Sequence, residues 1–223
     1  MEVFKGIGKF PVRVTDYFDF DKLDAFHSAE INTVFNGDKW ECILITEYEN
    51  AFFHIYTRNS IKNTEYFDIE PLFGYSGPIT NTTDNNFINK ALKIYSEHCI
   101  SSKIIAELFR FNPLLENHIP FQNSIINISS AKEIIIVNCH KDRETQLSEF
   151  NRLGKRYIHN IISDTTIDFY DNKSLDEFQK YYNTSLQKHN ADRILYLDDN
   201  FYNRAKDSAK FILAEVKYQG KIQ

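Results

Sequence analysis

The sequence predicts an α+β protein built from two units of similar size, residues 1–130 and residues 131–223. Runs of β-branched and aromatic residues predict paired strands in the first half, and apolar residues at helical spacing occur in both halves. The order of these elements changes between Ser129 and Lys132, where we place the boundary. A chain of 223 residues is long enough for two modest cores.

In the first unit, the apolar spacing in residues 22–35 predicts a short helix. Trp40 to Tyr48 and Phe52 to Thr57 predict two strands, and the residues between them suit a tight hairpin. A loop follows at Phe73 to Ile79, because its two glycines permit unusual backbone angles and Pro78 excludes a helix or central strand. The next helix begins near Asp84, a suitable N-cap, and carries an apolar stripe of Phe87, Ile88, Ala91, Leu92 and Tyr95.

Dense apolar content in residues 103–111 predicts a strand buried on both faces, and this strand ends at Asn112-Pro113. Residues 123–128 and residues 132–139 predict two more short strands. The second unit then reads as a helix in residues 142–162, a strand in residues 165–171 and a helix in residues 174–189. Ser174 and Glu177 form a capping box at the start of that helix. A helix near residues 198–209 leads into an alternating strand that turns at Gly220.

Composition and charge narrow the class of protein. The net charge of −5 disfavours a general nucleic-acid binder, and no apolar run approaches the ~20 residues of a membrane span. Without a signal-peptide pattern, we expect a cytoplasmic protein. Cys42, Cys99 and Cys139 lack metal-ligand or disulfide spacing, so we expect reduced, buried thiols. The scattered histidines give no metal site.

Two short motifs resemble a known family. Gly74-Tyr75-Ser76-Gly77-Pro78, then a helix, then Arg110-Phe111-Asn112-Pro113-Leu114-Leu115 resembles the FemAB-type branch of the GNAT superfamily. These bacterial transferases attach amino acids or other acyl groups to amines. The basic stretch at residues 152–161 is similar to a helix that opens the family's second unit, so the resemblance covers most of the chain.

The resemblance implies two GNAT-like units, each a mixed sheet flanked by helices. This sequence departs from the family pattern in three ways. Ser76 replaces a family glycine, and Asn112 replaces a histidine, although asparagine cannot exchange a proton near neutral pH. Family members also continue beyond the strand that matches residues 210–218, so the resemblance implies an incomplete second unit.

Arg110 is the strongest candidate for a binding residue, since a guanidinium on an apolar strand needs an oxygen-rich partner. That partner is a substrate group, an internal carboxylate such as Glu107 or Glu70, or solvent at an edge. Tyr75, Ser76 and Gly77, with Asn112, line the acceptor cleft under the functional interpretation. The alternative is a loop whose glycines serve only packing.

Basic residues further along the chain offer a second set of contacts. Lys155 and Arg156 would meet a diphosphate on the acceptor, or form a solvated helix face. His118 lies close enough in sequence to Arg110 to be considered as a base. The sequence identifies no catalytic residue with a defined role.

The resemblance implies acyl or aminoacyl transfer to an amine of a cell-envelope precursor, such as a peptidoglycan precursor or an amino sugar of a surface polysaccharide. The donor would be acyl-CoA or aminoacyl-tRNA, with no tightly bound cofactor, and the acidic net charge disfavours tRNA. The acceptor would be a nucleotide- or lipid-linked sugar or peptide. A rival is a non-catalytic protein that binds an acceptor, forms a homo-oligomer or pairs with a complementing polypeptide through its last strand. One mixed domain remains a third possibility.

Overall fold

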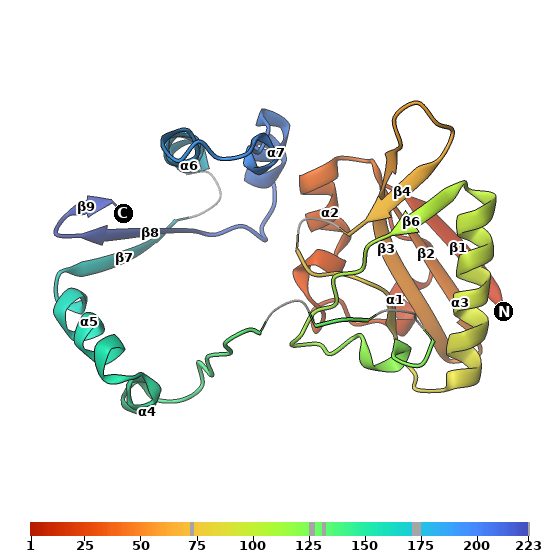
Figure 1. The fold of residues 1–223 in the computed structure, drawn as a ribbon, viewed down its shortest axis with the longest axis horizontal. Coiled ribbons are helices and arrows are strands. Elements are labelled where there is room, and N and C mark those ends of the chain that lie inside the picture. The colour runs from red at the N-terminus through yellow and green to blue at the C-terminus, as the bar shows by residue number, and fades with distance from the viewer. Residues whose placement is uncertain (72–73, 125–127, 131–132, 171–174, 223) are drawn as a thin grey trace. The chain divides into compact units, whose positions relative to one another are not determined.

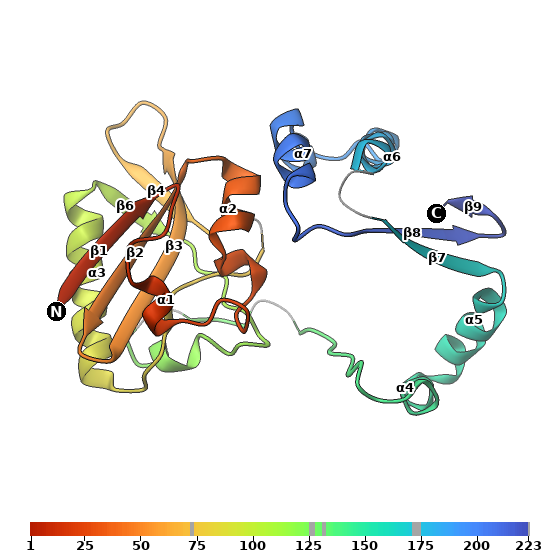
Figure 2. The ribbon, with the colours of Figure 1, turned by 180° about the vertical axis from the view of Figure 1, so that it is seen from behind.

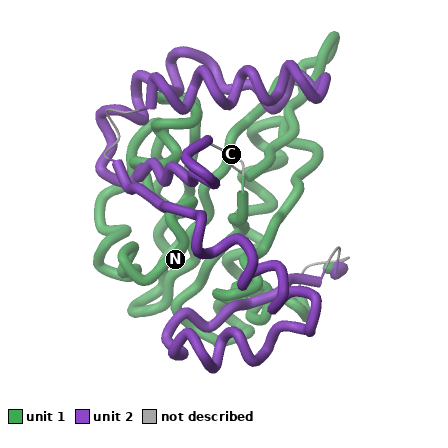
Figure 3. The backbone as a smooth tube through the Cα atoms, turned by 90° about the vertical axis from the view of Figure 1, so that its left-hand side faces the viewer, with its two compact units in different colours: residues 1–128 green, residues 129–223 purple. Residues whose placement is uncertain are grey.

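The computed structural model describes residues 1–71, 74–124, 128–130, 133–170 and 175–222. The chain divides into two compact units, residues 1–128 and residues 129–223, which Figure 3 distinguishes by colour. That both units are GNAT-like remains a prediction.

The first unit contains a mixed sheet with the strand order β1-β2-β3-β4-β6 (Figure 1). Its strands are β1 (Glu2–Ile7), β2 (Trp40–Glu47), β3 (Asn50–Ser60), β4 (Phe67–Glu70) and β6 (Ile104–Glu107), while β5 (Ile79–Thr80) pairs with β3. Among the strand pairs of this sheet in the described residues, only β4–β6 is parallel. The hairpin of β2 and β3 confirms the sequence prediction. β1 and β4 lie outside the strands predicted from the sequence.

The first unit contains three α-helices in its described part. They are α1 (Val14–Tyr17), α2 (Ala29–Asn36) and α3 (Asn85–Ser101), with short 3-10 turns at η1 (Ala25–His27) and η2 (Ile119–Phe121). Ser28 caps α2 through the amide of Ile31, and Asp84 caps α3 through the amide of Asn86. The expected N-cap of α3 is therefore confirmed. Leu92 is half-buried, and the other four residues of the predicted stripe are buried.

Helices cover both faces of the β2–β3 hairpin (Figures 1 and 2). Successive side chains of a strand point to opposite faces, so Ile43 and Ile45 join the core beneath α3 while Leu44 joins a second core on the α1 side. The residues of each core are fully or almost fully buried. Burial of one such large side chain stabilises the fold by about 1.5–3 kcal/mol.

The predicted strand in residues 103–111 is corrected in length and burial. β6 ends at Glu107, lies at the edge of the sheet and exposes Ile105 by 62%. β4 has four residues and its register with β6 stops at Glu107, so the ladder cannot extend along residues 108–111. Arg110 therefore lies beyond the strand rather than within it.

The second unit contains a three-stranded antiparallel sheet, β7-β8-β9, and four α-helices in its described part. Its elements are α4 (Arg143–Glu149), α5 (Arg152–Ile162), β7 (Thr165–Tyr170), α6 (Leu175–Lys188), η4 (Arg193–Leu195), α7 (Asp199–Lys206), β8 (Leu213–Tyr218) and β9 (Lys221–Ile222). The helix predicted for residues 142–162 is interrupted at Phe150, and Asn151 caps the next segment through the amide of Gly154.

Two further sequence predictions are corrected. Residues 133–138 form no strand because they pair with no other segment of the described chain, so the predicted strand at 132–139 is wrong there. Cys139 is exposed, whereas Cys42 is buried and Cys99 is half-buried. Residues 125–127 of the strand predicted at residues 123–128, and Ser174 of the capping box, lie outside the described residues. In the described ranges, no helix is long and apolar enough to cross a membrane.

Candidate functional site

The two segments singled out in the sequence meet in the first unit. The backbone amide of Ser76 donates to the carbonyl of Arg110 at 2.6 Å, and Ser76 forms a parallel bridge with Phe111. This register puts Tyr75 and Arg110 at neighbouring positions, one residue before the bridge on each segment. Both side chains are exposed to solvent, Tyr75 by 41%. The bridge thus brings the backbone of Tyr75 close to that of Arg110, two residues that the sequence proposed for one site.

Close packing explains the two glycines of the loop. Gly74 has a φ of 140°, and a Cβ at this position would lie 2.5 Å from the ring of Phe26. Gly77 has a φ of 90°, and its Cβ would lie 3.0 Å from the ring of Phe111. Other residues rarely adopt these angles. The packing interpretation of the glycines therefore has direct support.

Asn112 lies inside the protein and holds a turn. Its side-chain amide donates to Asp24 Oδ2 at 2.5 Å, and its Oδ1 accepts from the amides of Leu114 and Leu115. Local bonds of this kind are typical of an Asx turn before a helical segment. Ser76 is also buried, and its hydroxyl donates to the carbonyl of Ile55 at 3.5 Å. Both side chains are engaged within the protein, which favours a structural role over substrate contact.

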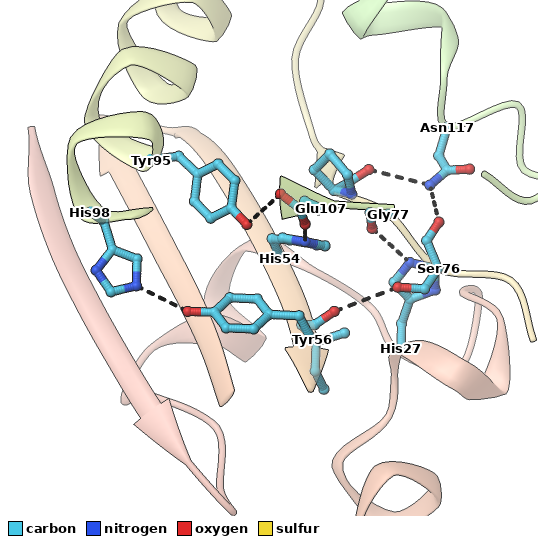
Figure 4. A network of polar contacts seen from close by, with 11 residues as sticks. His27, His54, Tyr56, Ser76, Gly77, Tyr95, His98, Glu107 and Asn117 are labelled. Carbon is cyan, nitrogen blue, oxygen red and sulfur yellow. Dashed lines mark hydrogen bonds and ion pairs between the residues drawn. The ribbon is translucent and has the colours of Figure 1, made fainter. Parts of the chain in front are cut away.

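Asn117 links the two segments and was missed in the sequence. Its Oδ1 accepts from the backbone amide of Asn112 at 2.8 Å. Its Nδ2 donates to the carbonyls of Ser76 and Pro78 at 3.1 and 3.2 Å (Figure 4). The side chain is buried, so these bonds are shielded from water. No sequence pattern distinguishes this asparagine from the many others in the chain.

His27 joins the same cluster from the 3-10 turn η1. It is fully buried, and its Nε2 donates to the carbonyl of Gly77 at 3.4 Å, while its Nδ1 has no partner among the described residues. Burial lowers the pKa of His27, and the bond to the Gly77 carbonyl partly opposes that change. A neutral ring at this position therefore suits the native packing. We refer to residues 74–78 and 110–112, held by Asp24, His27 and Asn117, as the platform.

A second buried network lies beside the platform in the sheet (Figure 4). His54 on β3 is 2% exposed, and its Nε2 lies 2.5 Å from Glu107 Oε1 on β6. The hydroxyl of Tyr95 on α3 donates to the other oxygen of Glu107 at 2.8 Å. Burial raises the pKa of Tyr95, and the negative charge of Glu107 adds to this effect. The network ties β3, β6 and α3 together just before the segment that carries Arg110.

A tyrosine–histidine pair extends this polar interior. Lys5 can only donate, so its bond to His98 Nδ1 leaves the hydrogen of the neutral ring on Nε2, which donates to the hydroxyl of Tyr56 at 3.0 Å. Burial lowers the pKa of His98 and raises that of Tyr56. The sequence did not point to His54, Tyr56, Tyr95 or His98, because only the fold brings them together.

The carboxylate partners proposed for Arg110 are engaged elsewhere. Glu107 bonds to His54 and Tyr95, and Glu70 accepts from Asn59. Arg110 is exposed, and whether it meets a substrate group or only solvent remains a prediction. His118 is half-buried, with its ring centroid 6.2 Å from that of Phe111. The platform thus exposes a guanidinium and a phenol on neighbouring backbone segments, and both groups are donors suited to carboxylate, phosphate or carbonyl oxygens.

The other predicted site residues lie in the second unit. Lys155 and Arg156 are exposed on α5, and whether they join one site with Tyr75 remains a prediction. Two surface hollows, along residues 15–21 and between α6 and β8, are lined by none of the predicted site residues. Within the described ranges, no group of three or more histidine, cysteine or acidic residues is placed to hold a metal ion.

The comparisons with known proteins bear on the fold. The sequence matches no protein-family model and no curated protein. The structure is similar to the crystal structure of FemX, with a TM-score of 0.54 and 13% sequence identity. The similarity covers 86% of this chain but 52% of the FemX chain, so this chain spans about half the length of that protein. The α+β chain, with its mixed sheet flanked by helices, therefore has a Fem-like fold.

Proposed function

We propose that the protein acts in acyl or aminoacyl transfer to an amine of a cell-envelope precursor. The observation that carries this proposal is the Fem-like fold, which extends over most of the chain and agrees with the motif resemblance in the sequence. The acceptor would be a peptidoglycan precursor or an amino sugar. The donor would be acyl-CoA or aminoacyl-tRNA.

In such a transfer the acceptor amine attacks the donor carbonyl and forms a C–N bond. The bond from that carbonyl to the thiol of CoA or the ribose oxygen of tRNA breaks, and the leaving atom takes up a proton. This chemistry depends on positioning and on donors to the developing oxyanion. We assign Arg110 and Tyr75 to the acceptor, where they would bind an anionic or carbonyl-bearing group. We assign Lys155 and Arg156 to a diphosphate on the same acceptor.

A second candidate is acceptor binding without turnover. Ser76 and Asn112 are engaged inside the protein, which leaves Tyr75 and Arg110 as the exposed polar side chains of the matched motifs in the first unit. A guanidinium has no acceptor, and a phenol keeps its proton near neutral pH, so neither is suited to deprotonate the amine. A binding subunit would need only these donors.

Mass spectrometry distinguishes the two candidates. The full chain would be incubated with amine-bearing UDP-linked precursors and with acyl-CoA or charged tRNA, and the acceptor mass would be followed. A mass increase that Arg110→Ala reduces supports transfer by this chain. An unchanged acceptor mass, together with acceptor binding that Arg110→Ala weakens, supports the binding subunit. If the acceptor mass does not change and the acceptor does not bind, both candidate functions are contradicted.

A further inference from the structure

The segment that carries Arg110 keeps the alternation of a strand after β6 has ended. Glu107, Phe109 and Phe111 are half-buried, while Leu108 and Arg110 are exposed. Successive side chains of a strand point to opposite faces. Side chains on the inner side of this segment therefore determine how firmly Arg110 is held on the outer side, because the β4–β6 ladder stops at Glu107.

Glu107 holds the first of the inward positions through both of its carboxylate oxygens (Figure 4). Its Oε1 lies 2.5 Å from His54 Nε2, and its Oε2 accepts from the Tyr95 hydroxyl at 2.8 Å. A carboxylate has no hydrogen to donate, so both neighbours donate to it. The Glu107 side chain is 15% exposed and that of His54 is 2% exposed, so water is a poor replacement for either bond.

His54 also holds the second inward position. Its ring packs edge-on against the ring of Phe109, with centroids 5.4 Å apart. The ring of Phe109 lies 5.6 Å from that of Phe111, which in turn stacks on the buried ring of Phe121 at 6.3 Å. One histidine on β3 thus contacts both Glu107 and Phe109, and the packing continues along the inner side of the segment.

We propose that Glu107 and His54 are positioning residues for Arg110. The pair fixes the backbone before Arg110, and the bond from the Ser76 amide to the Arg110 carbonyl fixes it at Arg110 itself. A guanidinium on an ordered backbone has less freedom to lose when it binds an anionic or carbonyl-bearing group. His54 is too buried to touch an acceptor, so it acts through Arg110. The effect on acceptor binding rests on the proposed function, whereas the effect on the backbone does not.

Binding of an amine-bearing UDP-linked precursor to the full chain tests this role. Glu107→Gln puts an amide donor against His54 or Tyr95, so it should weaken binding at least about threefold. Glu41→Gln is the matched control, because the Glu41 side chain is 16% exposed and pairs with Arg58 at 2.9 Å in the same sheet. This control should leave binding unchanged.

A double variant separates positioning from stability. Because Glu107 acts through Arg110, Glu107→Gln should weaken binding no further in an Arg110→Ala background. The same loss with and without the Arg110 side chain would assign Glu107 to stability alone and overturn the proposal. Equal binding by the wild type and Glu107→Gln, or equal losses in Glu107→Gln and Glu41→Gln, would overturn it as well.

Hydrogen exchange tests the positioning without an acceptor. The Ser76 amide should exchange about tenfold faster in Glu107→Gln, because its acceptor on Arg110 is held less firmly, and Glu41→Gln should not change it. If the wild type binds no precursor, the proposed function is contradicted, and this exchange pattern alone decides the positioning. Should Glu107→Gln not fold, Tyr95→Phe removes one donor and should speed the same exchange by a smaller factor. Unchanged exchange at Ser76 in the variant that folds would overturn the proposal.

Discussion

The two units bury their apolar residues to very different extents. In the first unit, both faces of the β2–β3 hairpin are covered, and two cores of buried residues result. In the second unit, the buried apolar residues of the described part are Leu175, Phe201, Tyr202 and Ala205. α5 has a clear apolar side with Leu153 and Tyr157, yet none of its residues is buried. The second unit therefore has helices with an apolar side, as α5 does, but buries few of its apolar residues.

The largest expected effect concerns the folding of each unit alone. Ordering the backbone costs about 1–2 kcal/mol per residue, and only a sizeable core offsets that cost. A fragment of residues 1–130 should therefore unfold cooperatively on heating, whereas a fragment of residues 131–223 should show no cooperative transition. Circular dichroism melts of the two fragments check this. A sharp transition in the second fragment would remove the distinction between the units.

A pair of phenylalanine substitutions sharpens the comparison at single positions. Phe52 is fully buried on β3, and Phe169 on β7 is 73% exposed. Phe52→Ala should lower the free energy of unfolding of the first unit by about 3–5 kcal/mol. Phe169→Ala should change the free energy of unfolding of the full chain by no more than about 0.5 kcal/mol. Urea unfolding of the full chain measures both, and similar losses would show that the assigned burial is wrong.

Asn117→Ala tests the platform itself. It should cost about 1–3 kcal/mol, because the Asn112 amide and the carbonyls of Ser76 and Pro78 lose a buried partner. Asn81→Ala is the matched control, since Asn81 makes similar bonds to Ala51 and Glu49. Only Asn117→Ala should speed hydrogen exchange at Ser76 and Asn112. The same exchange pattern in both variants would argue against Asn117 as the link.

The platform should also weaken in acid through His27. Its pKa is lowered in the folded protein from the ordinary value of 6.5, so the unfolded chain binds the proton more readily. The stability is fully present above pH about 6.5 and is lost as the pH falls through the lower folded value. Unfolding free energies measured from pH 8 to 5 should fall, and His27→Gln should make that fall shallower. His98 would leave a residual slope, because its pKa is lowered too. An unchanged slope in His27→Gln contradicts the role of His27.

The sequence predicted the parts of the fold that follow from local patterns. The β2–β3 hairpin and the cap of α3 depend on side-chain alternation and on Asp84, which are visible in a short window. The prediction that residues 103–111 form a strand buried on both faces was wrong. An apolar segment can also lie at the edge of a sheet, and the length of the β4–β6 ladder here depends on the length of β4. The bond between His54 and Glu107 and the bond between Asn117 and Ser76 could not be predicted, because the partners lie far apart in the sequence.

The smallest expected change in stability accompanies the most direct test of the site. Arg110 is exposed, so Arg110→Ala should leave the melting temperature unchanged. The central claim is that the platform presents Arg110 and Tyr75 together to an acceptor. Calorimetric titration of an amine-bearing UDP-linked precursor should therefore show binding that falls at least about tenfold in Arg110→Ala and in Tyr75→Ala. Equal affinity in the wild-type protein and both variants would contradict the claim.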